Sequence, residues 1–306
     1  MSTDDVNAKA PAVGVIGLGI MGGTFARHLV GAGARTLGYD PIAAQMKAFK
    51  ASGGEGCESA RSVAQEADVV ITSLPSEKAL DEALFGDEGI VAAGRRGLLV
   101  VETSTLPLDA KERARARLAE AGIAMLDAPI SGTGPQAVAK DITILASGER
   151  ADYERARGVL SHLARSVRYV GEFGAGSKVK YIANLLVAVH VLATAEAIVL
   201  GEKAGLDPAA LVEILADSAA TSRMLEVRGP SMAAGTYATP MMKVDVFQKD
   251  LEIIGAFARE AQSPVPLFRA SVPFFTAAAA QGMGGYDTGA VIAVLRRMAR
   301  VTGENG

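Results

Sequence analysis

Short apolar runs alternate with amphipathic segments along the first half of the chain. Runs typical of strands occupy 12–16, 36–39, 68–73, 97–101, 123–126, 141–146 and 167–170. Apolar residues at helical spacing mark the segments 24–30, 59–66, 76–84, 108–120 and 151–163. This regular alternation predicts a mostly parallel, doubly wound sheet with helices packed against it.

The strand pattern stops after Gly171. The segment 177–204 is filled with Ala, Leu, Val and Ile, and neither Pro nor Gly interrupts it before Gly201, so it predicts one long, mostly buried helix. Further helices are expected at 208–217, 243–260, 266–281 and 288–301. We therefore expect an α/β domain of Rossmann type over 1–173 and an all-helical domain over 174–306, joined by a long interdomain helix.

A Gly-rich turn, Gly-Leu-Gly-Ile-Met-Gly at 17–22, lies between the first strand and the first helix. Gly17 can make the tight turn, Gly19 can let backbone N–H groups approach a pyrophosphate, and Gly22 can let the helix pack on the strand. Asp40 ends the second strand, at the spacing expected for an acid that accepts hydrogen bonds from the adenosine ribose. The carboxylate would repel a 2′-phosphate and no arginine follows it, so NAD is favoured over NADP. The alternative is a tight turn without a ligand.

Three further segments follow predicted strands and contain small or hydroxyl-bearing residues. They are Leu74-Pro75, the residues 103–105 and the residues 131–134. Ligands of doubly wound sheets bind beyond the carboxyl ends of the strands. We therefore expect these segments to line the binding site.

Composition narrows the classes of partner. The 306 residues include 34 acids and 31 bases and have a mean hydropathy of +0.24, which indicates a globular chain without a basic surface for nucleic acid or anionic lipid. The single Cys57 excludes an internal disulfide framework and favours a reducing, cytoplasmic compartment. Residues 1–9 are polar and lack the apolar core of a signal peptide.

The run 185–200 is apolar enough to raise the question of a membrane span. It carries His190 and Glu196, however, and a buried core helix is the better interpretation. A metal site is not expected either, because the three histidines are scattered and no Cys, His and carboxylate group has the spacing of metal ligands.

Lys180 and Asn184 begin the long helix after a flexible entry that contains three glycines. Four residues apart, they share one helical face, whereas Lys178 points about 200° away from Lys180. On spacing alone, a functional lysine and amide remain as plausible as a surface lysine and a structural amide.

Four motifs in order resemble those of the β-hydroxyacid dehydrogenases, the family that includes 3-hydroxyisobutyrate dehydrogenase, tartronate semialdehyde reductase and L-threonate dehydrogenase. The resemblance covers nearly the whole chain. The motifs are the Gly-rich turn at 17–22, Asp-Ala-Pro-Ile-Ser-Gly-Thr at 127–133, the Gly-x-x-Gly-x-Gly-x-x-x-Lys-x-x-x-Asn pattern at 171–184 and Lys-Asp-Leu at 249–251. Two departures are Thr133, where a Gly is common, and Glu102, where an Asp is usual. The stretch 132–136 is more similar to the threonate branch, and the presence of Lys180 speaks against imine reductase activity.

The resemblance implies a role for each matching residue. Lys180 would be the general acid/base and Asn184 would position the substrate, whose carboxylate Ser131, Gly132 and Thr133 would bind. The cofactor-binding residues would be Gly17, Leu18, Gly19, Ile20, Met21, Gly22, Asp40, Leu74, Pro75, Thr105 and Lys249. No metal is needed for this reaction.

The expected activity is hydride transfer between a small β-hydroxy acid and NAD. The alternatives are a reductase of a small semialdehyde acid that works in the reverse direction and a non-catalytic binding or oligomerisation module on the same fold. The apolar surface of the helical half predicts a homodimer or homotetramer. Side-chain contacts that select the substrate would come from scattered helical positions such as Arg223, Lys243 and Phe247, which no motif identifies.

Overall fold

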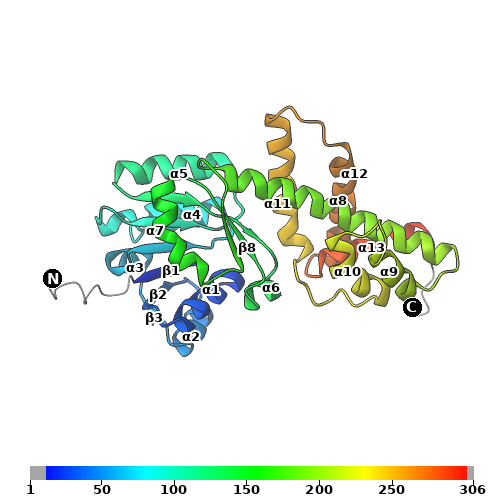
Figure 1. Cartoon of the computed structure of the whole chain (residues 1–306), viewed down its shortest axis with the longest axis horizontal. Helices are drawn as coiled ribbons and strands as arrows, with labels where there is room; N and C mark the ends of the chain where they lie inside the picture. The colour runs from blue at the N-terminus through cyan, green and yellow to red at the C-terminus, as the bar shows by residue number, and fades with distance from the viewer. Residues whose placement is uncertain (1–11, 302–306) are drawn as a thin grey trace, which may run out of the picture. The chain divides into compact units, whose positions relative to one another are not determined.

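The computed structural model describes residues 12–301, so the polar segment 1–9 lies outside the described part (Figure 1). The chain divides into two compact units, residues 1–180 and 181–306. Each unit is described by itself.

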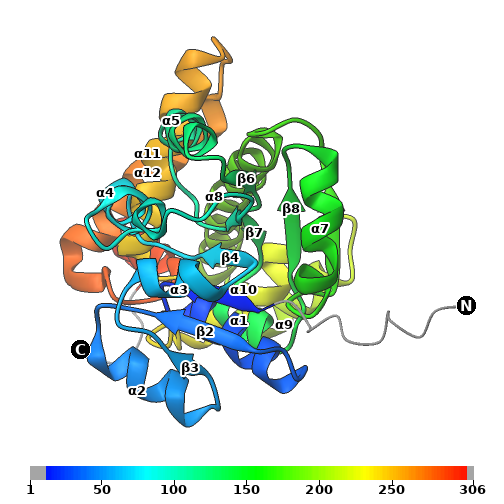
Figure 2. The same ribbon diagram turned by 90° about the vertical axis from the view of Figure 1, so that its left-hand side faces the viewer.

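The first unit is built on a six-stranded, fully parallel sheet in the order β3-β2-β1-β4-β5-β6 (Figure 2). Its strands are β1 (Val13–Ile16), β2 (Thr36–Tyr39), β3 (Glu55–Gly56), β4 (Val69–Thr72), β5 (Leu99–Glu102) and β6 (Ala124–Asp127). The central strands β1, β4 and β5 are buried along their whole length, as expected for strands covered on both faces.

Two apolar layers enclose this sheet. The helices of the first unit are α1 (Ile20–Gly31), α2 (Ala43–Ala51), α3 (Ala60–Glu66), α4 (Glu77–Phe85), α5 (Leu108–Glu120), α6 (Gly134–Val138) and α7 (Arg150–Ser161). Phe25 of α1 and Leu160 of α7 belong to one buried cluster, whereas Val63 of α3, Leu84 of α4 and Leu118 of α5 belong to the other. The predicted doubly wound α/β architecture is therefore confirmed.

The last two predicted strands are present but do not extend this sheet. β8 (Thr143–Ala146) and β9 (Ser166–Tyr169) form a separate three-stranded sheet with β7 (Ile130–Ser131), in the order β7-β8-β9. β7 pairs with β8 in the antiparallel direction and β8 with β9 in the parallel direction, so the expectation that 141–146 and 167–170 belong to the one mostly parallel sheet was wrong. The reason is that the chain runs on from β6 into β7 without an intervening helix, and β8, which follows α6, returns antiparallel to it, with Asp127 opposite Ser147 and Ser131 opposite Thr143.

The helix α8 (Ala175–Lys203) is the long helix that the apolar run predicted. By length and composition it could cross a membrane, and 44% of the residues of its most apolar window are buried within the protein. Its exposed apolar side chains include Val179, Ile182 and Leu186, which are spaced to share one face.

The second unit is helical. After α8 it contains α9 (Pro208–Ala216), α10 (Arg223–Ala234), α11 (Val244–Glu260), α12 (Pro266–Ala278) and α13 (Val291–Met298). The helix α10 has no counterpart in the sequence prediction, because Gly229 and Pro230 interrupt its apolar pattern. Its Arg228 is buried and donates a 3.0 Å hydrogen bond from Nε to the Asp287 carboxylate.

Candidate active site

Four neighbouring strands of the parallel sheet end at the same level. Ile16, Thr72, Glu102 and Asp127 are successive partners in register across β1, β4, β5 and β6. The segments that follow these residues therefore emerge at one carboxyl edge, where ligands of such sheets bind. Those segments contain the predicted cofactor residues after β1, β4 and β5 and the predicted substrate loop after β6.

The Gly-rich turn leaves open space at one of its three glycines. Gly17 has a positive φ of +86°, and a Cβ added there would lie 2.3 Å from the Ser73 carbonyl oxygen. A Cβ on Gly22 would lie 1.8 Å from the Gly17 carbonyl oxygen. At Gly19, which precedes α1, no described heavy atom lies within 4 Å of an added Cβ. The first N–H groups of a helix have no partner within it and attract anions, so this open space suits a pyrophosphate.

Asp40 is held in place by the two turns that flank it. Its Oδ2 accepts a 2.7 Å hydrogen bond from the Leu18 backbone N–H, and its Oδ1 accepts a 2.8 Å bond from the Ile42 N–H. A carboxylate oxygen has two lone pairs, so both oxygens retain acceptor capacity for ribose hydroxyls. The geometry thus fits the predicted dinucleotide site.

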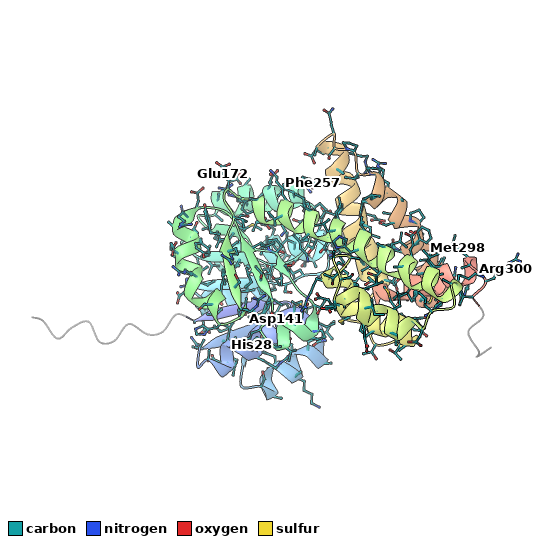
Figure 3. The ribbon with its side chains drawn as sticks, turned by 45° about the vertical axis from the view of Figure 1, so that its right-hand side comes forward. His28, Asp141, Glu172, Phe257, Met298 and Arg300 are labelled. Carbon is teal, nitrogen blue, oxygen red and sulfur yellow. The ribbon has the colours of Figure 1, made fainter. Side chains whose placement is uncertain are left out.

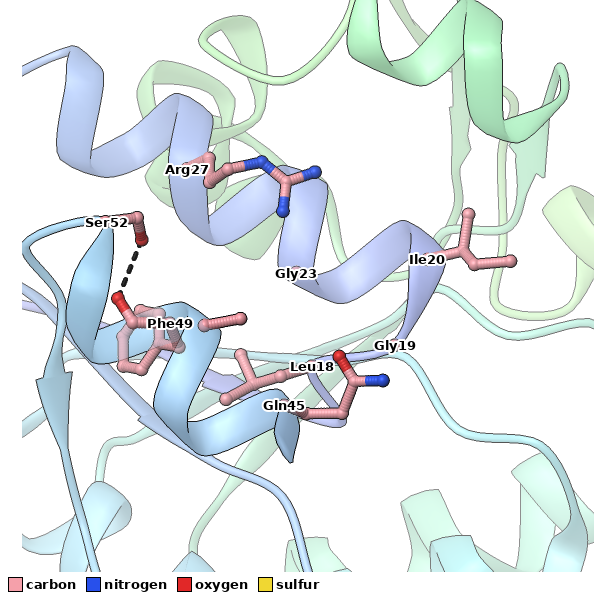
Figure 4. Close-up of a pocket in the computed structure, with 9 residues that line it drawn as sticks. Leu18, Gly19, Ile20, Gly23, Arg27, Gln45, Phe49 and Ser52 are labelled. Atoms are coloured by element: carbon pink, nitrogen blue, oxygen red, sulfur yellow. Dashed lines mark hydrogen bonds between the residues drawn. The ribbon is translucent and has the colours of Figure 1, made fainter. Parts of the chain in front are cut away.

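A small pocket of about 160 Å³ lies between α1 and α2, next to the Gly-rich turn (Figure 4). Leu18, Gly19 and Ile20 line it from the turn, and Gln45 lines it from α2. Arg27, also in its lining, donates a 2.8 Å hydrogen bond to the Thr24 hydroxyl. Arg27 therefore places a basic side chain near the Gly-rich turn, although no arginine directly follows Asp40 in the sequence.

The cofactor side of the edge is braced by hydroxyl groups. Ser104 Oγ accepts a 2.7 Å hydrogen bond from the Leu74 N–H, and Thr103 Oγ1 donates a 2.6 Å bond to the Thr72 carbonyl oxygen. Thr105, one residue further, is half-buried. The segments after β4 and β5 are thus tied together at the predicted cofactor residues.

The predicted substrate loop lies half-buried between β7 and α6. Ser131 pairs with Thr143 of β8, and Gly132 has a φ of +144°. The backbone N–H and the hydroxyl of Thr133 both donate to the Gln136 Oε1, each at 3.0 Å, as the cap of α6. Both hydrogen-bond donors of Thr133 are therefore directed at Gln136. Thr133 can donate to a substrate carboxylate only if one of these two bonds to Gln136 is broken or shared.

The same loop is joined to the cofactor helix through α6. His28 of α1 lies with its Nε2 atom 2.9 Å from the Ala137 carbonyl oxygen, and Figure 3 shows the position of His28. The Gly-rich turn leads into α1 and the substrate loop leads into α6, so this contact joins the two segments through their helices.

Lys180 and Asn184 lie on the buried face of α8, with exposures of 6% and 3%, whereas Lys178 is exposed. Within the second unit, Asn184 Nδ2 donates a 2.8 Å hydrogen bond to Asp250 Oδ2. An ionised carboxylate can only accept, so this bond fixes which end of the Asn184 amide faces Asp250.

Asp250 is a buried site residue that the sequence analysis did not single out. It follows Lys249 on α11, and the Lys249 Nζ lies 4.0 Å from the Asp250 Oδ1. The signal was its place in the Lys-Asp-Leu motif. Phe247 on the same helix is fully buried and packs edge-on against Phe275, so it belongs to the core.

Together, the parallel sheet, the Gly-rich turn and Asp40 at the end of β2 define a dinucleotide-binding protein of Rossmann type. Comparison with known proteins agrees. Residues 12–171 match the family described as the NAD binding domain of 6-phosphogluconate dehydrogenase, and residues 174–295 match the NAD-binding family of NADP-dependent 3-hydroxyisobutyrate dehydrogenase.

Several relatives match this chain over nearly the whole length of both sequences. The chain is 40% identical to L-threonate dehydrogenase of Cupriavidus necator, over 92% of this chain and 95% of the relative. It is 32% identical to 2-hydroxy-3-oxopropionate reductase of Escherichia coli, over 94% and 98%. A crystal structure of 3-hydroxyisobutyrate dehydrogenase from Salmonella typhimurium superposes with a TM-score of 0.83 at 33% identity, over 92% of this chain and 99% of that one.

The chain belongs to the β-hydroxyacid dehydrogenase family. It is an NAD(P)-binding dehydrogenase that acts on hydroxy acids, which confirms the enzymatic interpretation over a non-catalytic module.

Proposed function

We propose that this enzyme oxidises a small β-hydroxy acid with NAD and that Lys180 is its general acid/base. The observation that carries the proposal is the buried face of α8, which presents Lys180 one turn from Asn184, with the Asn184 amide oriented by Asp250. An amine placed within reach of the substrate hydroxyl can take its proton in oxidation and return it in reduction.

NAD, held by the Gly-rich turn and Asp40, would supply the acceptor for the hydride that leaves the carbinol carbon in the oxidative direction. Lys180 Nζ, as the neutral amine, takes the hydroxyl proton as the hydride departs, and in reduction the ammonium returns it. An N–H of the Asn184 amide would donate a hydrogen bond to the substrate hydroxyl oxygen, whose single proton goes to Lys180. The loop residues Ser131, Gly132 and Thr133 would hold the carboxylate, so that hydride transfer occurs from a positioned substrate.

L-Threonate is the substrate that we propose first. The 40% identical relative carries that activity in its name. A polyhydroxylated acid needs more hydrogen-bonding groups than a methyl-bearing one, and the Thr133 hydroxyl would supply one at the carboxylate loop on release from Gln136. The second candidate, reduction of a semialdehyde acid, is favoured by the 32% identical reductase.

NAD is the proposed cofactor because the Asp40 carboxylate stands where a 2′-phosphate would be repelled. Arg27, beside the Gly-rich turn, is the residue through which NADP would be tolerated. Initial rates with each cofactor at equal concentration test the preference, and equal rates with NADP would contradict the role of Asp40.

We further propose that residues 1–173 bind the cofactor and that residues 174–306 supply substrate contacts and oligomerisation. The exposed Val179, Ile182 and Leu186 of α8 support a homodimer or homotetramer, because a second copy would cover them. The proposed setting is the cytoplasm, without a membrane partner. A monomeric mass by light scattering would refute the oligomer.

The substrate is tested by NADH formation with a panel of acids that differ in one feature each. L-Threonate, glycerate, L-serine, 3-hydroxypropionate and 3-hydroxyisobutyrate vary in hydroxyl, amino and methyl groups around the same β-hydroxy acid frame. We expect the highest kcat/KM with L-threonate. A higher value with glycerate, together with fast reduction of tartronate semialdehyde, would favour the reductase.

A further inference from the structure

A cluster of buried charges lies beneath the start of α8, away from any solvent. Lys111, Glu102 and Asp127 have no exposed side-chain surface, and their neighbours Ser147 and Ser177 are also fully buried. The Lys111 Nζ donates to the Asp127 Oδ1 at 2.8 Å and to the Ser104 carbonyl oxygen at 2.7 Å, and it lies 3.9 Å from Glu102 Oε1.

The Asp127 carboxylate caps α8 from a strand 50 residues earlier in the chain. Its Oδ2 accepts from the Ser177 backbone N–H at 2.8 Å, and its Oδ1 accepts from the Ser177 hydroxyl at 2.8 Å. The Ser147 hydroxyl donates to the Asp127 carbonyl oxygen at 3.0 Å and accepts from the Gly176 N–H at 3.0 Å. Two N–H groups of the first helical turn, which have no partner within the helix, are satisfied in this way.

The helix start is also in close contact with the strand that leads to the substrate loop. A Cβ on Gly176 would lie 2.2 Å from the Leu145 carbonyl oxygen, 3.0 Å from Pro129 Cδ and 3.1 Å from the Asp127 carbonyl oxygen. Only a glycine allows the backbone of α8 to come this near. Pro129 and the loop that begins at Ser131 follow Asp127 directly.

Ser177 lies three residues before Lys180, on the same face of α8 and about 4.5 Å along its axis. A shift or rotation of the first turn would therefore move the Lys180 amine by a similar amount. Asp127 is thus linked to both groups whose separation matters for the reaction, to the amine through Ser177 and to the carboxylate loop through the chain that follows it.

We infer that Asp127, acting through Ser177 and balanced by Lys111, is a positioning residue that sets where Lys180 stands relative to the substrate-carboxylate loop. This inference rests on the proposed role of Lys180. It predicts that loosening the Ser177 contact slows hydride transfer itself and leaves cofactor binding and folding almost unchanged.

The test compares Ser177→Ala with Ser271→Ala. Ser271 is equally buried and loses one comparable hydrogen bond, from its hydroxyl to the Phe268 carbonyl oxygen at 2.8 Å, but it lies on α12 in the other unit. With the best acid of the panel, we expect Ser177→Ala to lower kcat about tenfold, since a misplacement of about 1 Å can cost about a hundredfold. We expect the NAD Kd and the Tm to change no more than in Ser271→Ala.

A deuterium isotope effect separates positioning from simple loss of folded enzyme. With substrate deuterated at the carbinol carbon, the isotope effect on kcat should rise in Ser177→Ala, because a displaced base makes the chemical step slower. A smaller fraction of active enzyme would lower kcat without that rise, and this outcome would overturn the inference. Asp127→Asn, which replaces an acceptor by a donor, should show the same signature more strongly if it folds.

A second readout does not depend on turnover. Amide hydrogen exchange of the peptide 172–182 should be faster in Ser177→Ala than in the wild type and unchanged in Ser271→Ala. Equal exchange in Ser177→Ala and the wild type would refute the positioning role of the contact between Ser177 and Asp127. Lys180→Ala separates the two proposals. If that variant stays active, the proposed acid/base role fails. If it is inactive while Ser177→Ala behaves like Ser271→Ala, only the positioning inference fails.

Discussion

The open space at Gly19 leads to a sharp prediction for cofactor binding. An Ala methyl at this position meets no described heavy atom within 4 Å, and the φ of −65° is allowed for any residue. Gly19→Ala should therefore fold normally. The methyl would, however, occupy the space before α1 into which a pyrophosphate must come to reach the helix N–H groups.

The expected magnitudes differ for folding and for binding. Replacing Gly by Ala at this helix cap should change the free energy of unfolding by less than about 1 kcal/mol. Losing one charge-assisted hydrogen bond to the pyrophosphate costs about 1.5–3 kcal/mol, which corresponds to a rise in Kd of roughly tenfold to a hundredfold.

The assay is NAD titration by isothermal calorimetry, with urea unfolding in parallel. Gly31→Ala is the matched control, because Gly31 ends the same helix and a Cβ added there also meets open space. That variant should bind NAD like the wild type. Wild-type affinity in Gly19→Ala would refute the placement of the pyrophosphate at the start of α1.

Contacts elsewhere in the protein lead to three more predictions. Asp250→Ala should lower kcat/KM about tenfold to a hundredfold by releasing the Asn184 amide, and unchanged kinetics would exclude the orienting role. Arg228→Met should lower the free energy of unfolding by about 3–5 kcal/mol, because it leaves the Asp287 carboxylate buried without its cation. Urea denaturation measures this free energy, and a loss below about 1 kcal/mol would contradict the prediction. Burial raises the pKa of the Cys57 thiol, so less thiolate is present at pH 8 than in free cysteine, and Cys57 should react with iodoacetamide more slowly than glutathione does.

Much of the first unit could be predicted from the order of apolar runs. Strand β2 and helix α5 have the predicted bounds, because an apolar run between turn residues and an amphipathic pattern after a proline are strong local signals. Elements with few buried residues were missed. The helix α2 buries only Phe49, and β3 is two residues long.

The separate sheet could not be predicted from pattern, because the pattern of a strand does not specify its partner. β8 and β9 have the apolar character of parallel strands, but only the return of the chain after α6 places β8 antiparallel to β7. This is a tertiary choice that single-sequence patterns do not encode.

The candidate site shows the same division between local and long-range information. Lys180 and Asn184 share a helix, so their common face followed from spacing. Lys111, in contrast, lies in a charged amphipathic helix and looks like a solvated residue in the sequence. Its burial against Asp127 depends on contacts between α5 and the end of β6, which no local pattern predicts.

The central claim is that Lys180 is the general acid/base, and the most direct measurement compares Lys180→Ala with Lys178→Ala. The two lysines are two residues apart on one helix, one buried and the other exposed. NADH formation from the best hydroxy acid should be lost by at least about a hundredfold in Lys180→Ala, with NAD binding retained, because general acid–base catalysis contributes about that much. Lys178→Ala should turn over like the wild type. Turnover within a few-fold of wild type in Lys180→Ala would contradict the account.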